Sequence, residues 1–384
     1  MGERTLSMGS KIWEPVLSAA SGEIETIMPI EVTTILAFAI ILSAFCAILG
    51  QRSKLSSPIL VQILIVSGLG LGTLLTPLPI NRYFLVGVLG FAAYLLFQSH
   101  CRATTKTMSL AQIALAILLV LVSSFSDHSL AMFAGLGLGF TLLPLFPFHL
   151  PFVSLVSSAH GAMSGLWVTV FLSLGLAELT ELPTFLSEGM PSAVSWLALG
   201  SALYASLKCL GQTQIRPLLT YATIAQASML WGLTTVFSIF SEWVISFGLT
   251  IAFVMTALLF TYHCIQQRFG SHALGTLPGL ALVMPRLGVC LIILISFAVL
   301  LPLVPVLSGL PALPTANNQD VCLVILCFII FVVWIFESWY FPHLMHQTAF
   351  GKARPDIPYS DLTAGEISGL TLLIAAASYH GLFY

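Results

Sequence analysis

Apolar runs of about 20 residues recur along the whole chain, separated by short stretches that carry charges, prolines or glycines. An α-helix of that length crosses the hydrocarbon core of a bilayer, which is about 30 Å thick. The pattern predicts about twelve transmembrane helices, at residues 33–50, 58–78, 83–98, 109–125, 130–147, 152–176, 193–210, 217–238, 242–264, 279–307, 321–343 and 362–382. We therefore expect an all-α polytopic integral membrane protein.

The composition leaves room for one domain only. Hydrophobic residues make up 58% of the chain and charged residues 7%, so no segment outside the membrane is large enough to bury a core of its own. We expect residues 31–384 to form a single transmembrane domain. Residues 1–30, the longest polar stretch, are too polar at their start for a secretory signal. They are predicted to form a polar, amphipathic segment that packs on a neighbouring subunit.

Basic and acidic residues alternate between successive predicted loops. One set of loops holds Arg52, Lys54, Arg102, Lys106, Lys208, Arg216, Arg268, Lys352 and Arg354, and the other set holds most of the acids. Positive charge marks the cytoplasmic or matrix side of a membrane, so both termini are predicted on the intermembrane-space or periplasmic side. Arg82 is the exception to this pattern, and Glu178 and Glu181 are expected in a solvated loop.

The sequence carries no signal for a cofactor. Its seven cysteines are scattered singly through apolar segments without a CxxC pair, which favours small buried hydrophobic residues over metal ligands or disulfides. It contains neither a glycine-rich dinucleotide fingerprint nor a P-loop. A net charge of −2 without a basic face offers nucleic acid no binding surface. We expect no metal, no redox cofactor and no nucleotide in this chain.

Two short proline-containing segments resemble each other. Leu143–Pro147 reads LPLFP, and Leu301–Pro305 reads LPLVP. Proline removes a backbone donor and blocks the bond to residue i−4, so we expect helix breaks at Pro144, Pro147, Pro302 and Pro305. Freed backbone at membrane depth is tolerated only where protein or a watery cavity covers it. Paired interrupted helices in the two halves of a chain are typical of inverted-repeat transporters.

Few titratable groups lie within the predicted membrane region, and each is a candidate for a proton path. His149 and His160 follow the first break, Lys208 and Arg216 flank the next polar segment, and Glu337 stands in the second half of a predicted span. An ionised side chain at mid-membrane costs roughly 2.5–3.5 kcal/mol on insertion scales, and histidine passes protons near neutral pH. The alternatives remain a helix-end His149, a packing His160 and a Lys208 that only anchors a loop.

Three segments together resemble a known family. Residues 139–152 read GFTLLPLFPFHLPF, residues 157–167 read SSAHGAMSGLW, and residues 210–232 read LGQTQIRPLLTYATIAQASMLWG. The proline-broken helix followed by PFH, the SG-containing helix and the Gln-Thr-Gln-Ile-Arg-Pro run resemble the antiporter-like membrane subunits of respiratory complex I, and most of all subunit 2, or N. The resemblance covers roughly residues 130–345, the expected antiporter-like core.

The resemblance implies a membrane-arm subunit of proton-translocating NADH:ubiquinone oxidoreductase, without a redox centre or active site of its own. The flavin mononucleotide, iron–sulfur clusters and quinone are then expected in other subunits. The expected partners are neighbouring antiporter-like and small membrane subunits, together with lipids. The expected location is the mitochondrial inner membrane, with a bacterial plasma membrane as the alternative.

The sequence departs from the family's pattern where the resemblance implies relay residues. The expected lysines fall at Thr141 or Leu142, near Thr169 or Ser173, and at Thr256. The early predicted helix at residues 83–98 has no glutamate where the family carries one. Arg216 keeps the basic position of the motif, but an arginine stays protonated and can bias a proton path without carrying the proton.

These departures leave three functions open. In the first, His149, His160, Lys208 and Glu337 take over the relay of a complex I subunit. In the second, the chain is the proton-conducting partner of an inorganic-carbon uptake or sodium/proton antiport system. In the third, it is a non-conducting scaffold whose helices complete a membrane arm. Only the first two predict that replacing a candidate relay residue lowers proton transport.

Overall fold

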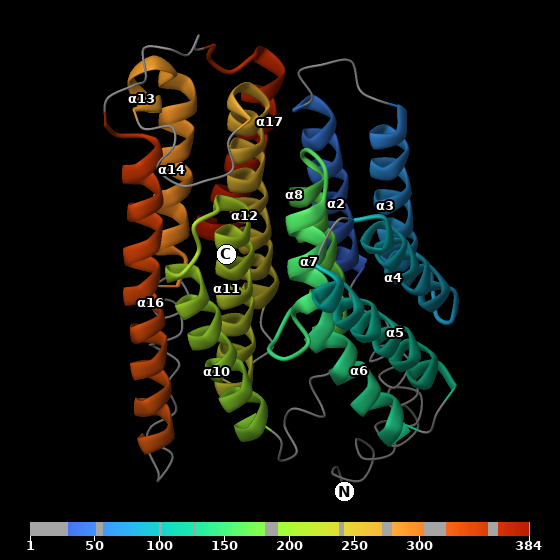
Figure 1. Ribbon diagram of the computed structural model, residues 1–384. Coiled ribbons are helices and arrows are strands. Elements are labelled where there is room, and N and C mark those ends of the chain that lie inside the picture. The colour runs from blue at the N-terminus through green and yellow to red at the C-terminus, as the bar shows by residue number, and fades with distance from the viewer. Residues whose placement is uncertain are drawn as a thin grey trace, which may run out of the picture.

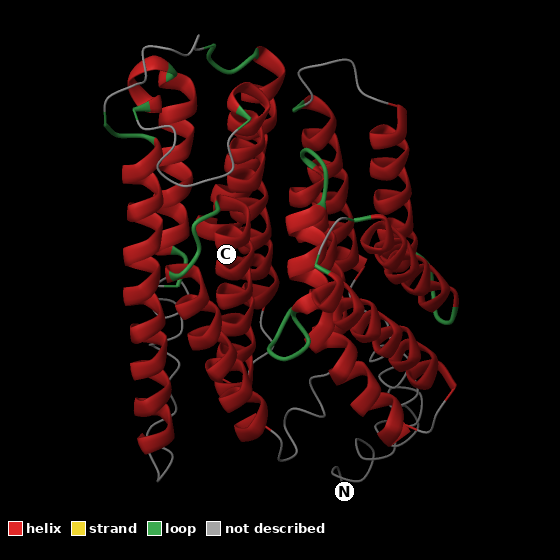
Figure 2. Ribbon diagram, viewed as in Figure 1, coloured by secondary structure: helices red, strands yellow, loops and turns green. Residues whose placement is uncertain are grey.

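The computed structural model is a bundle of α-helices (Figures 1 and 2). It describes residues 30–50, 57–99, 102–125, 128–180, 191–237, 242–270, 279–302, 320–351 and 360–383. Most of the predicted N-terminal segment, residues 1–29, lies outside the described residues. The helices run roughly alongside one another, with α12 and α8 near the middle of the bundle and α16 and α5 toward its edges.

The helices begin and end close to the limits of the apolar runs. Their bounds are α2 Ile30–Leu49, α3 Ser57–Leu75, α4 Ile80–Gln98, α5 Ala103–Phe125, α6 His128–Leu142, α7 Leu150–Ser158, α8 Met163–Thr180, α10 Pro191–Leu210, α11 Ile215–Phe237, α12 Glu242–Phe269, α13 Leu280–Val283, α14 Pro285–Leu300, α16 Asp320–Thr348 and α17 Ala364–Phe383. In the part of the chain that the structure describes, eight helices are long and apolar enough to cross a membrane. The prediction of an all-helical multi-pass membrane protein is confirmed, and the total of about twelve spans stays a prediction.

The two central helices are buried almost all round. α8 packs on α2, α3, α6, α7 and α12, and α12 also contacts α11, α14 and α17. Glycines allow these close approaches. A Cβ on Gly165 would lie 2.8 Å from Cγ2 of Thr256 in α12, and one on Gly175 would lie 2.8 Å from the backbone nitrogen of Leu143. The small residues of α8 therefore set how closely α12 and the end of α6 approach it.

The peripheral helices expose large apolar side chains instead. Phe97 of α4, Phe125 of α5 and Trp339 of α16 are all more than two-thirds exposed. A soluble protein rarely exposes so much apolar surface. In a membrane protein such surfaces face lipid or neighbouring subunits, which agrees with the multi-pass assignment.

One predicted span is wrong in its position. The apolar pattern predicted a single helix at residues 152–176, but α7 ends at Ser158 and α8 begins at Met163. The chain turns at Gly161, whose φ of 64° lies in the left-handed region that glycine adopts without strain. Because the turn is short and rich in small residues, the apolar pattern runs through it without a visible gap.

Candidate functional site

The first interruption lies between α6 and α7. α6 ends at Leu142 and α7 begins at Leu150, so Pro144 and Pro147 both lie in the connecting turn. The two helices barely contact each other, whereas α7 packs against α5, α8 and α11. The first part of the turn is buried, because Leu143 and Leu145 have no exposed surface, whereas Phe146 and Pro147 are exposed. The backbone polar groups of the buried part must therefore find partners within the protein.

Side chains of three neighbouring helices bind that freed backbone. Trp231 of α11 donates from Nε1 to the Leu143 carbonyl (3.3 Å), and Ser201 of α10 accepts from the Phe146 backbone nitrogen (2.9 Å). On the other side, α5 contributes Gln112, whose Nε2 donates to the Pro147 carbonyl (2.9 Å), and Ser109, whose hydroxyl donates to the Leu150 carbonyl (3.2 Å). Trp231, Ser201 and Gln112 thus bind backbone groups of the turn, and Ser109 binds the first carbonyl of α7.

Arg216 binds the other end of α7. Its Nη1 donates to the carbonyls of Ala159 (2.8 Å) and Ser157 (3.4 Å), and its Nη2 donates to Oε1 of Gln266 (2.9 Å). The guanidinium also lies over the ring of Tyr262, 5.9 Å from its centroid. The last carbonyls of a helix lack partners within the helix and carry the negative end of its dipole. Arg216 therefore acts as a cationic cap for α7.

The end of α14 is bound in a similar way. α14 ends at Leu300, Pro302 follows in a turn, and Pro305 lies outside the described residues. Gln226 of α11 donates from Nε2 to the Ala298 carbonyl (3.2 Å), and Trp334 of α16 donates from Nε1 to the Val299 carbonyl (3.0 Å). Side chains of one helix, α11, therefore bind the ends of α6, α7 and α14.

His149 and Lys208 both lie close to the ring of one tyrosine, Tyr204. His149 is only 2% exposed, and its ring centroid lies 5.5 Å from that of Tyr204 and 5.6 Å from that of Phe146. Lys208 is exposed, and its Nζ lies 5.6 Å from the centroid of Tyr204. Tyr221 completes the surroundings of the imidazole at 6.3 Å. The three side chains His149, Tyr204 and Lys208 thus connect the first interruption to the surface of the chain.

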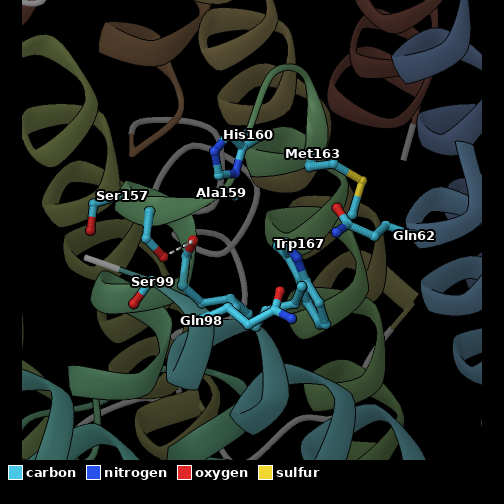
Figure 3. Close-up of a pocket in the computed structure, with 11 residues that line it drawn as sticks. Gln62, Gln98, Ser99, Ser157, Ala159, His160, Met163 and Trp167 are labelled. Carbon is cyan, nitrogen blue, oxygen red and sulfur yellow. Dashed lines mark hydrogen bonds between the residues drawn. The ribbon is translucent and has the colours of Figure 1, made fainter. Parts of the chain in front are cut away.

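His160 lies apart from this group. It is exposed and lines a cavity of about 520 Å³ between α3, α4, α7 and α8. Figure 3 shows His160, Gln62, Gln98 and Trp167 around this cavity. His149 precedes the first residue of α7 and His160 follows its end, so a helix of roughly 13 Å separates them. The structure does not bring the two histidines together.

Three of the positions where the resemblance implies lysines, Thr141, Thr169 and Thr256, carry hydroxyl groups that are hydrogen-bonded, whereas the buried Ser173 hydroxyl has no partner among the described residues. Thr169 of α8 lies 2.9 Å from Thr256 of α12 and 2.8 Å from Ser43 of α2, measured between hydroxyl oxygens. Thr256 donates its own proton to the Gly165 carbonyl at 2.9 Å. All of these side chains are buried. Thr141, also buried, donates to the Gly137 carbonyl of its own helix at 3.2 Å.

The acids are placed differently from the sequence prediction. Glu178 was expected in a solvated loop, but it lies within α8, is buried and is ion-paired with Arg82 of α4. That pair also explains Arg82, the exception to the charge pattern, because its charge is neutralised inside the bundle. Glu337, in α16, has no exposed surface.

Sequence reasoning missed the most completely bonded acid, Glu366. It forms a two-pronged ion pair with Arg268, at 2.9 Å and 2.5 Å, and it accepts from the backbone nitrogen of Thr363 at 2.7 Å. The signal was present: Thr363-Ala-Gly-Glu366 has the spacing of a capping box, in which residue N3 bonds back to the N-cap. Among the described residues, no cluster of His, Cys, Asp and Glu has an arrangement that could hold a metal ion.

A bundle of membrane helices, two of them ending at proline-containing turns and bound there by a common neighbour, defines a polytopic membrane protein of transporter type. Residues 80–334, more than half of the chain, match the family described as NADH:quinone oxidoreductase/Mrp antiporter, TM. The chain belongs to this family.

Solved structures share the fold at low sequence identity. A chain of respiratory complex I from Thermus thermophilus with bound NADH superposes with a TM-score of 0.74 at 18% identity, covering 92% of this chain and 81% of that chain. A chain of the membrane-bound sulfane sulfur reductase, an archaeal respiratory membrane complex, superposes with a TM-score of 0.73 at 16% identity, covering 91% of this chain and 64% of that chain. A chain of the Mrp complex from a Dietzia species superposes with a TM-score of 0.68 at 14% identity, covering 91% of this chain and 79% of that chain. No curated protein sequence matches the chain.

Proposed function

We propose that this chain is a membrane-arm subunit of a proton-translocating NADH:ubiquinone oxidoreductase, of the subunit 2 or N type. The observation that supports the proposal is the role of α11. The segment that carries the resemblance, residues 210–232, supplies Arg216, Gln226 and Trp231, the side chains that bind the ends of α7, α14 and α6. The motif is therefore tied to the interrupted helices, the feature on which ion transport through a helical membrane protein depends.

The proposed proton path uses the side chains beside the first interruption. In this path Lys208 exchanges protons with the aqueous surface, Tyr204 contacts both Lys208 and His149, and His149 is buried just before the start of α7. Histidine suits such a step, since its two ring nitrogens can take up and release a proton near neutral pH. Arg216 contributes a fixed positive charge and does not itself exchange a proton. The flavin, iron–sulfur clusters and quinone site belong to other subunits of the proposed complex.

The experiment that tests membership is purification of the intact complex through an affinity tag on this chain. We expect many co-purifying subunits, bound flavin and iron–sulfur absorption, and NADH:quinone oxidoreductase activity in the purified material. Co-purification with only one or a few membrane proteins, without flavin, would contradict the proposal and support the antiport or carbon-uptake alternative. The mitochondrial inner membrane and the plasma membrane are separated by fractionating the host cells.

A non-conducting scaffold is the second candidate, and the hydroxyl groups at Thr169, Thr256 and Ser43 favour it. Because the Thr256 hydroxyl donates to the Gly165 carbonyl, the chain of hydrogen bonds ends on a group that cannot pass a proton onward. These three hydroxyl groups, which we term the hydroxyl clamp, then hold α2, α8 and α12 together and do not conduct protons. A subunit with this clamp has its proton path elsewhere or has none.

Proton transport per electron distinguishes the two candidates. His149→Gln and Lys208→Gln are introduced into the complex in sealed vesicles, and acidification is measured against NADH oxidation. The proposed path predicts a lower ratio in both variants, with electron transfer retained. His346→Gln, which alters an exposed histidine of α16 far from the path in sequence, is the matched control. An unchanged ratio in all three assembled variants would contradict the proposed path through His149 and Lys208 and support the scaffold.

A further inference from the structure

Glu337 is a buried carboxyl group outside the proposed path through Lys208, Tyr204 and His149. Glu337 occupies the middle of α16, has no exposed surface, and neither of its carboxylate oxygens is hydrogen-bonded to any residue that the structure describes. The other buried acids, Glu178 and Glu366, are both ion-paired with arginine. Glu337 is therefore available for chemistry in a way that they are not.

Its neighbours are polar but neutral. Tyr340, one turn further along α16, and Gln226 of α11 face the carboxyl group without closing a hydrogen bond of good geometry. Among the residues that the structure describes, Cys209 of α10 is the remaining titratable group close enough to interact with it. Of the described helices, α10, α11 and α14 pack on α16, and α14 presents backbone carbonyls near its end.

The position of Glu337 connects it to the second interruption. Trp334, one turn earlier on the same helix, binds the Val299 carbonyl, and Gln226, which faces the carboxyl group, binds the Ala298 carbonyl. α11, α14 and α16 lie next to one another in the bundle (Figure 1). The acid thus lies beside the C-terminal end of α14, where the partial negative charge of the helix dipole gathers.

An ionised carboxylate is poorly placed here. A lone charge inside a bilayer protein requires a counter-charge, and the groups facing Glu337 supply none. Residues 303–319, which follow α14 in sequence, contain no lysine or arginine. A carboxylic acid that carries its proton satisfies the site, because it offers one donor and keeps its acceptors for Tyr340 and Gln226.

We propose that Glu337 is a proton-binding site beside the end of α14, served by Gln226 and Tyr340. The carboxyl O–H bond breaks as the proton leaves for a water molecule or a neighbouring acceptor, and it forms again when a proton returns. The site deepens the proposed function, on which its use in transport rests. It would supply a relay group at the second interruption in a chain that lacks the lysines of the family pattern.

A hydrophobic carbodiimide tests the site directly. Such reagents react with protonated carboxyl groups in apolar surroundings: the acid gives its proton to the carbodiimide nitrogen and its oxygen adds to the central carbon, without a leaving group. Dicyclohexylcarbodiimide is applied to membranes containing the native complex, and the labelled peptides are quantified by mass spectrometry over a range of pH. We expect label on Glu337 that falls about tenfold for each pH unit above the midpoint.

The chain supplies its own controls. Glu178 and Glu366 are also buried but are paired with arginine, so they should stay unlabelled. Glu337→Gln removes the label while keeping the shape of the side chain, and Glu337→Asp keeps a carboxyl group and restores it. Equal label on all three acids, or none on Glu337 at any pH, overturns the proposal. Protection by sodium at constant pH overturns it too, since the site would then bind an alkali cation.

Transport supplies a second readout. In sealed vesicles, Glu337→Gln is expected to lower protons moved per electron by at least the share that passes through this site, and Glu337→Asp to restore part of it. If Glu337 is labelled but the ratio is unchanged in Glu337→Gln, the site binds a proton that transport does not use, which overturns its role in the relay. Label on Glu337 does not depend on the partners of the chain, so failure of complex I membership and failure of this site are told apart.

Discussion

Glu366 and Glu337 are the same residue type, equally buried, and bonded in opposite ways. Glu366 accepts from both terminal nitrogens (Nη1 and Nη2) of Arg268 and from Thr363. The remaining donors of Arg268 bind the carbonyls of Ser360, Asp361 and Cys264. Glu337 faces neutral groups and closes no hydrogen bond with them. The difference teaches that burial alone does not assign a role to an intramembrane acid. Its set of partners does, because a completely bonded acid joins helices and an unpaired one remains free to exchange a proton.

The largest expected effect lies at the paired acid. Glu366→Gln leaves the Arg268 charge buried without its counter-charge, which typically costs about 3–5 kcal/mol. We expect loss of the assembled complex, or a large drop in its thermal stability measured by size-exclusion chromatography after heating. Thr363→Ala, which removes only the hydroxyl part of the cap, should cost about 1 kcal/mol. If Glu366→Gln is no less stable than Glu337→Gln, the proposed difference between the paired and the unpaired acid is wrong.

The cap on α7 should show the next largest effect. Arg216→Ala leaves the carbonyls of Ala159 and Ser157 without their charged donor, and hydrogen bonds to charged groups contribute about 1.5–3 kcal/mol. Arg216→Lys keeps the charge but loses the fork that binds these carbonyls and Gln266 together, so its stability should be intermediate. Heating curves of the detergent-solubilised complex provide the measurement. Full stability in Arg216→Ala would show that the cap is not structural.

A glycine in α8 tests whether the first interruption is rigid. A Cβ on Gly175 would lie 2.8 Å from the backbone nitrogen of Leu143 and 3.0 Å from the carbonyl carbon of Leu142. Backbone atoms cannot swing away, so Gly175→Ala should cost about 1–3 kcal/mol through overpacking. Gly200→Ala, in α10, is the matched control, because no atom lies within 4 Å of its added Cβ. Equal heating curves for the two variants would mean that the turn after α6 yields without cost.

The smallest effect is expected at the hydroxyl clamp. Removing both partners of a buried hydrogen bond with groups of the same shape is nearly neutral, whereas removing one leaves the other unsatisfied at about 1–3 kcal/mol. Thr169 bonds both Ser43 and Thr256, so Thr169→Val alone leaves the Ser43 hydroxyl without its partner. The triple variant Ser43→Ala, Thr169→Val and Thr256→Val removes all three hydroxyl groups and should therefore be more stable than Thr169→Val alone. Proton transport should be unchanged in the triple variant, since the clamp ends on the Gly165 carbonyl. Lost transport with assembly intact would instead place these hydroxyl groups on the path.

Much of the fold could be predicted from the sequence, because the length of an apolar run decides whether a helix can cross a membrane. Helix limits were found within a few residues for most spans, and Pro144 and Pro147 lie in the turn after α6. The boundary between α7 and α8 was missed, since Gly161 interrupts the backbone without interrupting the apolar pattern. Glu178 was misplaced for a related reason: its partner Arg82 is distant in sequence and no local signal pairs them.

Candidate site residues could be named from the sequence, but the contacts that they make could not. His149, Lys208, Arg216 and Glu337 were proposed because titratable and charged side chains are rare in the chain, and their role in a proton path stays a prediction. Their roles depend on which helices become neighbours, and no spacing in the sequence reveals that Arg216 meets the end of α7. Tyr204, whose ring lies close to both His149 and Lys208, has no sequence feature that would distinguish it from any other aromatic residue in an apolar helix.

The hydrogen bonds of α11 have a mechanical consequence. A single helix, α11, is hydrogen-bonded to the ends of three others, through Trp231 to α6, Arg216 to α7 and Gln226 to α14. A tilt or translation of α11 by the length of one hydrogen bond would break all three contacts at the same time. A conformational change at one interrupted helix would then be transmitted to the other through α11 alone.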